Sequence, residues 1–203
     1  MSTKILFIPG VGADPNFWRP MAWCLSRPRG DIHLTLPGLG DQPHDPAVQS
    51  FDDLIRHAQR HVGPREGPVD IVAQSMGGAV ALQLALRRPA YVRRLVLVAT
   101  SGGLDVTALG GQDWRPDYAR NFPRAANWVR EASLDYSADL SCVTQPILLL
   151  WGDADPISPL AVGERLQSLL PNAQLHVIAG GTHSMALNRA NEIAPLIRAH
   201  FEA

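Results

Sequence analysis

The chain has 203 residues, of which 46% are hydrophobic and 18% are charged, a composition typical of a globular protein with one sizeable core. Its 18 basic and 19 acidic side chains nearly cancel, which leaves a formal charge of -1. The charges form no run of one sign, so the sequence argues against a nucleic acid or an anionic membrane as partner. The longest apolar stretches are far shorter than a membrane span.

The start of the chain runs from Lys4 into a short apolar stretch that ends at Pro9. A secretory signal would need a longer apolar region and a small-residue cleavage site. The two cysteines, Cys24 and Cys142, lie far apart and outside any metal-ligand pattern, so we expect reduced, buried thiols, with a disulfide as the alternative. These features together favour a cytoplasmic protein.

Short apolar runs alternate along the chain with longer segments of helical periodicity. The runs predict strands at residues 4–8, 32–36, 69–73, 95–99, 147–151 and 175–178, and the longer segments predict helices at residues 16–25, 51–62, 77–88, 160–170 and 191–201. Strands rich in Val, Ile and Leu without polar alternation are typical of a parallel sheet that is covered on both faces. We therefore expect an α/β fold, a mostly parallel, doubly wound sheet with helices on both faces, in a single domain over residues 1–203.

Residues 101–145 interrupt this alternation between two expected strands. The segment is too long for an ordinary connection, and only residues 117–122 and 125–132 show weak helical patterns. We interpret the segment as a small lid that shapes a pocket; the alternative is an arm that only covers the sheet. Aromatic side chains in this segment and in the first expected helix either line an apolar pocket, which we predict, or fill the core. The candidate pocket residues are Trp18, Trp114 and Trp128.

The strongest chemical signal is the stretch V-D-I-V-A-Q-S-M-G-G-A at residues 69–79. An apolar strand ends just before Ser75 and a helix rich in small residues begins just after it, so Ser75 lies on a sharp turn at the carboxyl edge of the sheet. Ala73 and Gly77 provide the small neighbours that such a turn needs. The helix dipole would favour an oxyanion above the turn. The alternative is a serine that only caps the helix.

This stretch resembles the nucleophile elbow, G-x-S-x-G, of the α/β-hydrolase fold family, with Ala73 in place of the first glycine. The resemblance implies an α/β-hydrolase fold with Ser75 as the nucleophile of a serine hydrolase. Residues 36–41, L-P-G-L-G-D, are similar to the family's D-x-P-G-x-G-x-S region, although an aspartate is missing before the proline. The likeness covers nearly the whole chain outside residues 101–145.

Seven histidines could supply the base that a serine nucleophile needs. His183 follows the last expected strand in A-G-G-T-H-S-M, where the resemblance places the family's base. His44, in a loop at the same sheet edge, is the rival. The other five lie in expected strands, on a helix or at the chain end: His33, His57, His61, His176 and His200. His57 and His61 have a metal-binding spacing but lack the glutamate of H-E-x-x-H, so we expect a solvated helix face and no metal site.

The base in turn needs an acid that fixes its tautomer. The loop W-G-D-A-D-P that follows the strand at residues 147–151 is similar to the family's G-x-x-D acid loop, which implies Asp155 as the acid. Asp153, which could instead cap the turn through nearby backbone amides, and the more distant Asp105 remain alternatives. The chain order Ser, Asp, His is the order expected for this fold.

The first expected strand ends in F-I-P-G-V-G-A-D at residues 7–14. Family members often show H-G-x-G here, and Pro9 stands in the place of that histidine. By this resemblance, the backbone N–H groups of Val11 and Met76 form an oxyanion hole. The loop does not match G-x-G-x-x-G, so we expect no dinucleotide site and no cofactor.

A serine at the elbow excludes the branch of the family whose nucleophile is aspartate, which includes epoxide hydrolases and haloalkane dehalogenases. We therefore expect an enzyme that cleaves a small-molecule ester or thioester with a small or medium acyl group, through an acyl-enzyme intermediate. Two alternatives remain open. One is C–C bond hydrolysis or lyase chemistry on the same triad, and the other is a catalytically silent ligand-binding protein with this fold.

Overall fold

The structure, a computed structural model, describes residues 3–25 and 30–203. Six strands form one sheet in the order β2-β1-β3-β4-β5-β6, and each pair of neighbours is parallel. The strands are β1 (Lys4–Ile8), β2 (Ile32–His33), β3 (Val69–Gln74), β4 (Val92–Val98), β5 (Ile147–Gly152) and β6 (Ala173–Ile178). The predicted α/β class and parallel sheet are confirmed.

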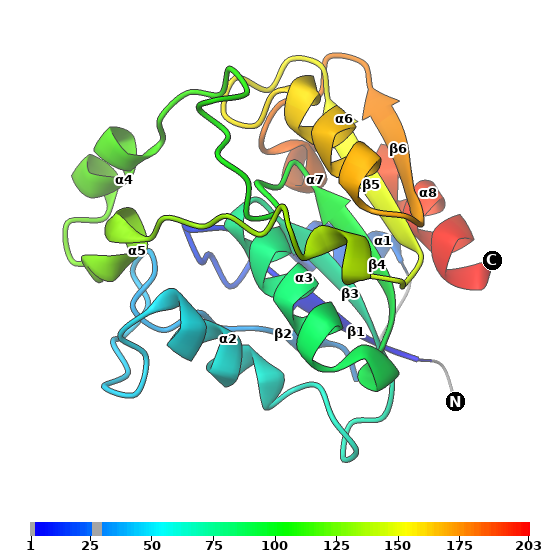
Figure 1. The fold of residues 1–203 in the computed structure, drawn as a ribbon, viewed down its shortest axis with the longest axis horizontal. Helices are drawn as coiled ribbons and strands as arrows, with labels where there is room; N and C mark the ends of the chain where they lie inside the picture. Colours follow the sequence, from blue (N-terminus) through cyan, green and yellow to red (C-terminus); the bar gives the residue numbers. More distant parts are fainter. Residues whose placement is uncertain (1–2, 26–29) are drawn as a thin grey trace.

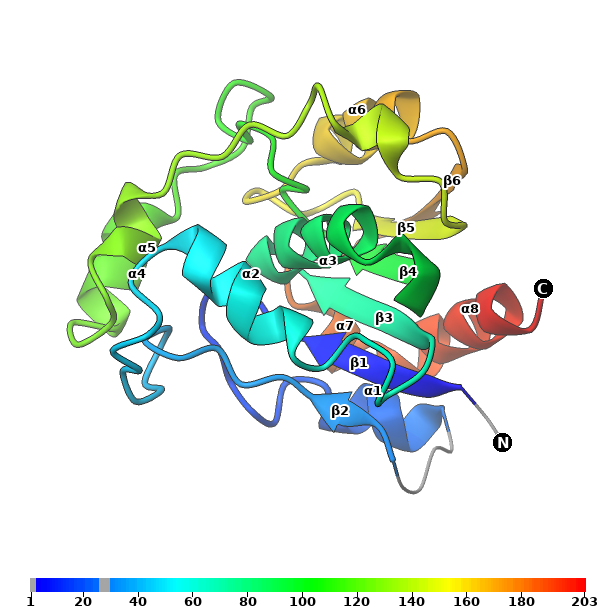
Figure 2. The ribbon, with the colours of Figure 1, turned by 60° about the horizontal axis from the view of Figure 1, so that its bottom comes forward.

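Helices cover both faces of this sheet, as Figures 1 and 2 show. One face packs against α2 (Phe51–Gln59), α3 (Met76–Arg87) and α6 (Leu160–Leu169), and the other against α1 (Arg19–Cys24), α7 (Met185–Asn188) and α8 (Ala190–Glu202). Each face has its own apolar cluster. None of the helices in the described part of the chain combines the length and the apolar character that a membrane crossing requires.

Two elements near the N-terminus are shorter than predicted. Strand β2 was expected at residues 32–36 but ends at His33. Its pairing continues only as far as Leu34, whose N–H donates to the carbonyl of Phe7 (2.9 Å), because Pro37 has no N–H and Gly38 then turns the chain at φ 77°. Helix α1 begins at Arg19, and residue 16 lies in the preceding turn.

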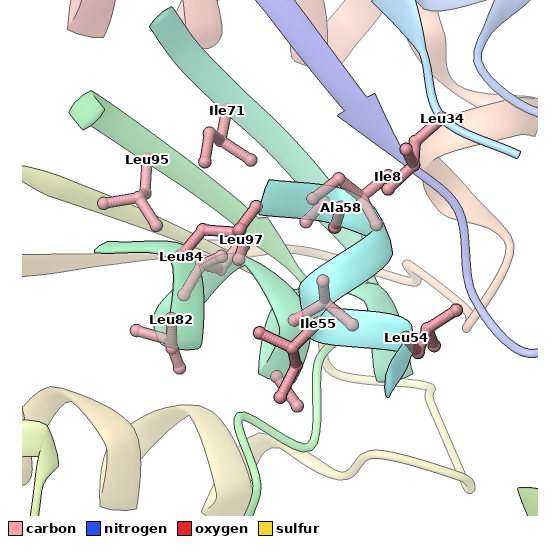
Figure 3. Packing of buried hydrophobic residues seen from close by; sticks show 14 of the residues in the cluster. Ile8, Leu34, Leu54, Ile55, Ala58, Ile71, Leu82, Leu84, Leu95 and Leu97 are labelled. Carbon is pink, nitrogen blue, oxygen red and sulfur yellow. The ribbon is translucent and has the colours of Figure 1, made fainter. Parts of the chain in front are cut away.

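The side chains of β3 are buried on both faces of the sheet, because helices pack above and below it. Figure 3 shows one of these layers, with Ile71 of β3 and Leu97 of β4 on the sheet side and Ile55 of α2 and Leu82 of α3 on the helix side. Strand β3 lies between β1 and β4. The residue that follows β3 therefore emerges in the middle of the carboxyl edge, where loops from both sides can reach it.

Residues 101–145 leave the sheet after β4 and return to it at β5. They contain two short helices, α4 (Arg115–Asn121) and α5 (Trp128–Glu131), and a 3-10 turn at Leu140–Cys142. The two predicted helical pieces are therefore present, the second shorter than expected. Figures 1 and 2 both show α4 and α5 beside the first turn of α2, at the carboxyl end of the sheet.

Three histidines make the stability of the fold depend on pH, and two of them, His57 and His200, are partly buried. Burial is the main cause that lowers the pKa of His33, His57 and His200 from the usual value of 6.5, and nearby arginines lower each of them further. As the pH falls below 6.5, the unfolded chain therefore binds protons before the folded chain does. The free energy of unfolding must decline through that range, down to the lowered pKa values of the folded state.

We expect His200→Gln to flatten this decline, because it removes one group that the folded protein keeps neutral. The measurement is urea denaturation of wild type and variant at about pH 7.5 and about pH 5. His176→Gln, on the exposed edge of β6, is the control and should keep the wild-type difference between the two pH values. If the free energy of unfolding of His200→Gln fell between the two pH values as much as that of wild type, His200 would not be a source of the decline.

Candidate active site

Ser75 connects β3 to α3 in a strained conformation, with φ 54° and ψ -129°. Its N–H donates to the carbonyl of Val98 (3.1 Å), and its own carbonyl accepts from the N–H of Gly78 (3.0 Å). Gly77 must be small, since a Cβ there would lie 2.4 Å from the carbonyl oxygen of Pro9. The turn therefore packs directly on the loop that follows β1, as the small-residue pattern of the sequence predicts.

The structure brings Ser75, His183 and Asp155 into one hydrogen-bonded row. His183 Nε2 lies 3.1 Å from Ser75 Oγ, and His183 Nδ1 lies 2.8 Å from Asp155 Oδ2. The three residues come from the loops that follow β3, β6 and β5, which meet at the carboxyl edge of the sheet. This row has the order and spacing in which a carboxylate orients an imidazole and the imidazole accepts a hydroxyl proton.

The surroundings of Asp155 fix the direction of these hydrogen bonds. Its side chain is fully buried, and Oδ1 accepts from the N–H groups of Ile157 (2.9 Å) and Ser158 (3.1 Å). An ionised carboxylate only accepts, so His183 Nδ1 must donate to Oδ2. In the neutral ring, Nε2 then carries the lone pair that faces the Ser75 hydroxyl.

The alternative acids and the alternative base have other partners. Asp153 Oδ1 accepts from the N–H of Gly180 (2.6 Å). Asp105 is exposed, and its Oδ1 is bonded within its own turn. His44 Nε2 lies 2.8 Å from the carbonyl of Arg124. The geometry therefore favours Asp155 and His183 over these three alternatives.

The loop after β1 lies against the turn at Ser75, as an oxyanion hole would require. A Cβ on Gly10 would lie 2.5 Å from Gln74 Oε1 and 3.0 Å from the Cβ of Ser75. Val11, the next residue, lines one cavity together with Ser75 and Met76. These positions are compatible with the predicted pair of N–H donors, Val11 and Met76, which stays a prediction.

The cavity beside Ser75 and His183 has a volume of about 410 Å³ and a largely apolar wall. Residues 101–145 provide much of that wall, and the loop of Asp155 and helix α2 provide other parts. The apolar lining includes Leu104, Val106, Trp114, Val129, Leu134 and Ile157. Its size and lining suit a small or medium organic group.

Of the three tryptophans predicted at the pocket, Trp114 lines this cavity. The prediction for Trp18 is wrong: its side chain is 2% exposed and packs on Phe7, in the cluster on the other face of the sheet. The prediction for Trp128 is also wrong, because its ring packs against the core of the α2 face and not on the cavity wall. Their sequence signal, an aromatic residue at the start of a short helix, is the same for a core and for a pocket.

Residues 101–145 are fastened to neighbouring loops on two sides. On one side they are bonded to the loop that follows β2, where the Tyr118 hydroxyl accepts from the N–H of Gly40 (2.8 Å) in a buried contact. On the other side, the N–H of Gln112 donates to the carbonyl of Pro156 (2.8 Å), next to Asp155. Burial raises the pKa of the Tyr118 hydroxyl. The segment is thus part of the cavity wall in this conformation.

Two buried hydroxyl residues near the row escaped the sequence analysis. Thr100 and Ser158 are 0% and 2% exposed, and the Ser158 hydroxyl donates to the carbonyl of Thr100 (3.1 Å). The only sequence signal for Thr100 was a polar residue directly after an apolar strand, which is common in loops, and Ser158 was one more polar residue in the loop that carries Asp155. In the described part of the chain, no cluster of three or more His, Cys, Asp or Glu side chains could hold a metal ion.

Comparison with known families agrees with this geometry. A sequence model described as "Alpha/beta hydrolase family" matches residues 5–133, and one described as "alpha/beta hydrolase fold" matches residues 112–190. The chain belongs to the alpha/beta hydrolase family. The family predicted from the elbow and its neighbouring loops is confirmed.

Curated relatives of this hydrolase-family chain include esterases. The chain is similar to a poly(3-hydroxyalkanoate) depolymerase of Ectopseudomonas oleovorans, at 28% identity over 96% of this chain and 83% of the relative. It is also similar to a pimeloyl-[acyl-carrier protein] methyl ester esterase of Neisseria meningitidis, at 28% identity over 96% of this chain and 91% of the relative. The predicted likeness to esterase-type enzymes is confirmed.

Solved structures show the same fold. A meta-cleavage product hydrolase from Pseudomonas fluorescens IP01 superimposes with a TM-score of 0.79 at 21% identity, covering 99% of this chain and 91% of that one. An esterase from Thermogutta terrifontis gives a TM-score of 0.76 at 19% identity, covering 100% of this chain and 90% of that one.

We expect Tyr118→Phe to loosen the contact between residues 101–145 and the loop after β2, because the buried N–H of Gly40 loses its acceptor. The free energy of unfolding should fall by about 1 to 3 kcal/mol, measured by urea denaturation, and limited proteolysis should cut residues 101–145 faster. Tyr136→Phe, whose ring packs on Gly103, serves as the matched control. Equal stability of the two variants would argue against this anchor.

Proposed function

We propose that this chain is a serine hydrolase that cleaves a carboxylic ester or thioester with a small or medium acyl group through an acyl-enzyme intermediate. The observation that carries the proposal is the row from Asp155 through His183 to Ser75, with distances of 2.8 Å and 3.1 Å, beside an apolar cavity. Relatives named for the hydrolysis of a methyl ester and of a polyester support the choice of bond.

Acylation begins when Ser75 Oγ attacks the carbonyl carbon of the substrate. His183 Nε2, 3.1 Å from that oxygen, accepts the hydroxyl proton. Asp155 stabilises the imidazolium that forms, because its carboxylate is buried and already aligned with Nδ1. The tetrahedral intermediate then collapses, and His183 gives its proton to the departing alcohol or thiol.

Deacylation repeats these roles with water as the nucleophile. His183 takes a proton from the water as its oxygen attacks the acyl carbon, and then returns a proton to Ser75 Oγ as the carboxylic acid leaves. In both steps the negative oxygen would be held by the N–H groups of Val11 and Met76, which line the cavity beside Ser75. A donor of this kind typically contributes a factor of about 10²–10³ to turnover.

The acyl group would lie against the apolar wall that residues 101–145 provide. The volume of about 410 Å³ is near the lower end of the range for small-molecule pockets, which supports small and medium acyl groups. We propose that residues 101–145 form a lid that covers this pocket. The hydrogen bonds of Tyr118 and Gln112 hold the lid to the loops on either side.

Two alternatives compete with ester hydrolysis. The fold is shared with a meta-cleavage product hydrolase, and hydrolysis of a C–C bond could employ the same serine and base. A silent binding protein would need none of the hydrogen bonds between Ser75, His183 and Asp155. A panel of p-nitrophenyl esters, acyl thioesters and vinylogous diketones of graded size separates the three cases.

We expect wild-type protein to react with a fluorophosphonate probe and to hydrolyse short p-nitrophenyl esters, and Ser75→Ala to do neither. His183→Ala should lower kcat by a factor on the order of 10⁶, as loss of the base does in serine proteases. His44→Ala is the matched control and should keep most of the activity, because its ring contacts the carbonyl of Arg124. Labelling that persists in Ser75→Ala would refute the proposed nucleophile.

The two aspartates of the acid loop can be separated by amide substitution. We expect Asp155→Asn to lower kcat by a factor on the order of 10⁴, because the amide can favour the wrong histidine tautomer. Asp153→Asn should have a much smaller effect, since its contact is with the N–H of Gly180. Steady-state kinetics on the best ester of the panel measures both, and a larger loss for Asp153→Asn would reverse the assignment.

A further inference from the structure

A fully buried hydroxyl, that of Thr100, lies directly behind the nucleophile turn. Thr100 follows β4, the neighbour of β3, and is 0% exposed. Its Oγ1 lies 2.5 Å from the carbonyl oxygen of Ser75, and the N–H of Gly102 donates to the same Oγ1 at 2.9 Å. The hydroxyl therefore bridges the turn after β4 and the backbone of the proposed nucleophile.

The direction of these two hydrogen bonds is determined by their chemistry. The N–H of Gly102 can only donate, so Oγ1 accepts from it. The carbonyl of Ser75 can only accept, so the single hydroxyl proton of Thr100 points at that oxygen. The N–H of Gly78 donates to the same carbonyl at 3.0 Å. Both acceptor sites of the Ser75 carbonyl are thus occupied.

That carbonyl belongs to the same peptide group as the N–H of Met76. Met76 is the first residue of α3, so its N–H has no acceptor within the helix, and the residue lines the cavity with Ser75. A donor on the carbonyl oxygen polarises the peptide group and strengthens its N–H as a donor, by about 10–30% per bond. The hydrogen bond also fixes the plane of the peptide, and hence the direction in which the N–H points.

We propose that Thr100 is a positioning residue for the oxyanion hole: its hydroxyl orients and polarises the Ser75–Met76 peptide group, so that the Met76 N–H meets the developing anion. This inference rests on the proposed hydrolase function. A threonine that merely fills space would need no bond to the Ser75 carbonyl.

The surroundings hold Thr100 in place on two further sides. A Cβ on Gly78 would lie 2.1 Å from Oγ1 of Thr100, so the glycine in α3 makes room for the hydroxyl. The Ser158 hydroxyl donates to the backbone carbonyl of Thr100 (3.1 Å), and the N–H of Ser158 donates to Asp155 Oδ1 (3.1 Å). Thr100 thus connects the nucleophile turn to the acid loop by a route that does not pass through His183.

The test compares Thr100→Ser with Thr100→Ala, a pair in which both variants lack the methyl group and only one keeps the hydroxyl. Each is assayed for kcat and KM on a p-nitrophenyl ester, and for inhibition by a trifluoromethyl ketone, whose adduct with Ser75 places an anionic oxygen in the hole. We expect Thr100→Ala to lower kcat about 10-fold, less than the loss of a whole donor, and to weaken the inhibitor by a similar factor. KM should stay within about twofold of wild type, and Thr100→Ser should stay close to wild type throughout.

Equal kcat and equal inhibitor affinity in Thr100→Ser and Thr100→Ala would overturn the inference, because the hydroxyl would then have no role of its own. A change in KM or in the free energy of unfolding alone, with kcat and inhibitor affinity unchanged, would also overturn it. If Thr100→Ala does not fold, Thr100→Val, which keeps the size of the side chain, replaces it. Failure of wild-type protein to react with the fluorophosphonate would refute the hydrolase proposal itself, whereas reaction of the wild type without a serine–alanine difference refutes only the role of Thr100.

Discussion

The backbone of Ser75 is held in a conformation that an L-residue adopts only when its surroundings enforce it, and the rest of the site depends on this constraint. Such a residue costs about 1–3 kcal/mol, yet both of its peptide groups are bonded, through Val98, Gly78 and Thr100. Gly77 allows the turn to pack on the loop after β1. The strain is therefore offset by long-range hydrogen bonds, and its result is a hydroxyl that projects from the middle of the carboxyl edge of the sheet.

The loops that carry the proposed acid and the proposed base are held together by close backbone packing. A Cβ on Gly152 would lie 2.0 Å from the carbonyl oxygen of Gly181, and that carbonyl accepts from the N–H of Ala154 (3.0 Å). Asp153 adds a hydrogen bond to the N–H of Gly180. The runner-up acid therefore has a structural role in the same site: it holds the loop that carries the proposed base.

Residues 101–145 provide a large part of the pocket wall in this chain. They provide much of the apolar wall of the cavity and are hydrogen-bonded to the loops on either side. The alignments to the two curated relatives run over 235 and 245 positions, more than the 203 residues of this chain, so the relatives carry segments that it lacks. The cavity under residues 101–145, which hydrogen bonds hold on both sides, has a modest volume. The proposed preference for small or medium acyl groups follows from that volume.

The sequence by itself determined the alternation of strands and helices and the turn at Ser75. Both depend on residues that are close together in the chain: the spacing of apolar residues, and the small residues around the serine. It also placed His183 and Asp155 in loops at one sheet edge, because the carboxyl ends of parallel strands meet there. Only the tertiary structure showed that Asp155, and not Asp153, is bonded to His183, separated Trp114 from Trp18 and Trp128, and revealed Thr100. Each of these distinctions depends on which atoms of distant loops come within hydrogen-bond or packing distance, and the local pattern of residues is the same for either outcome.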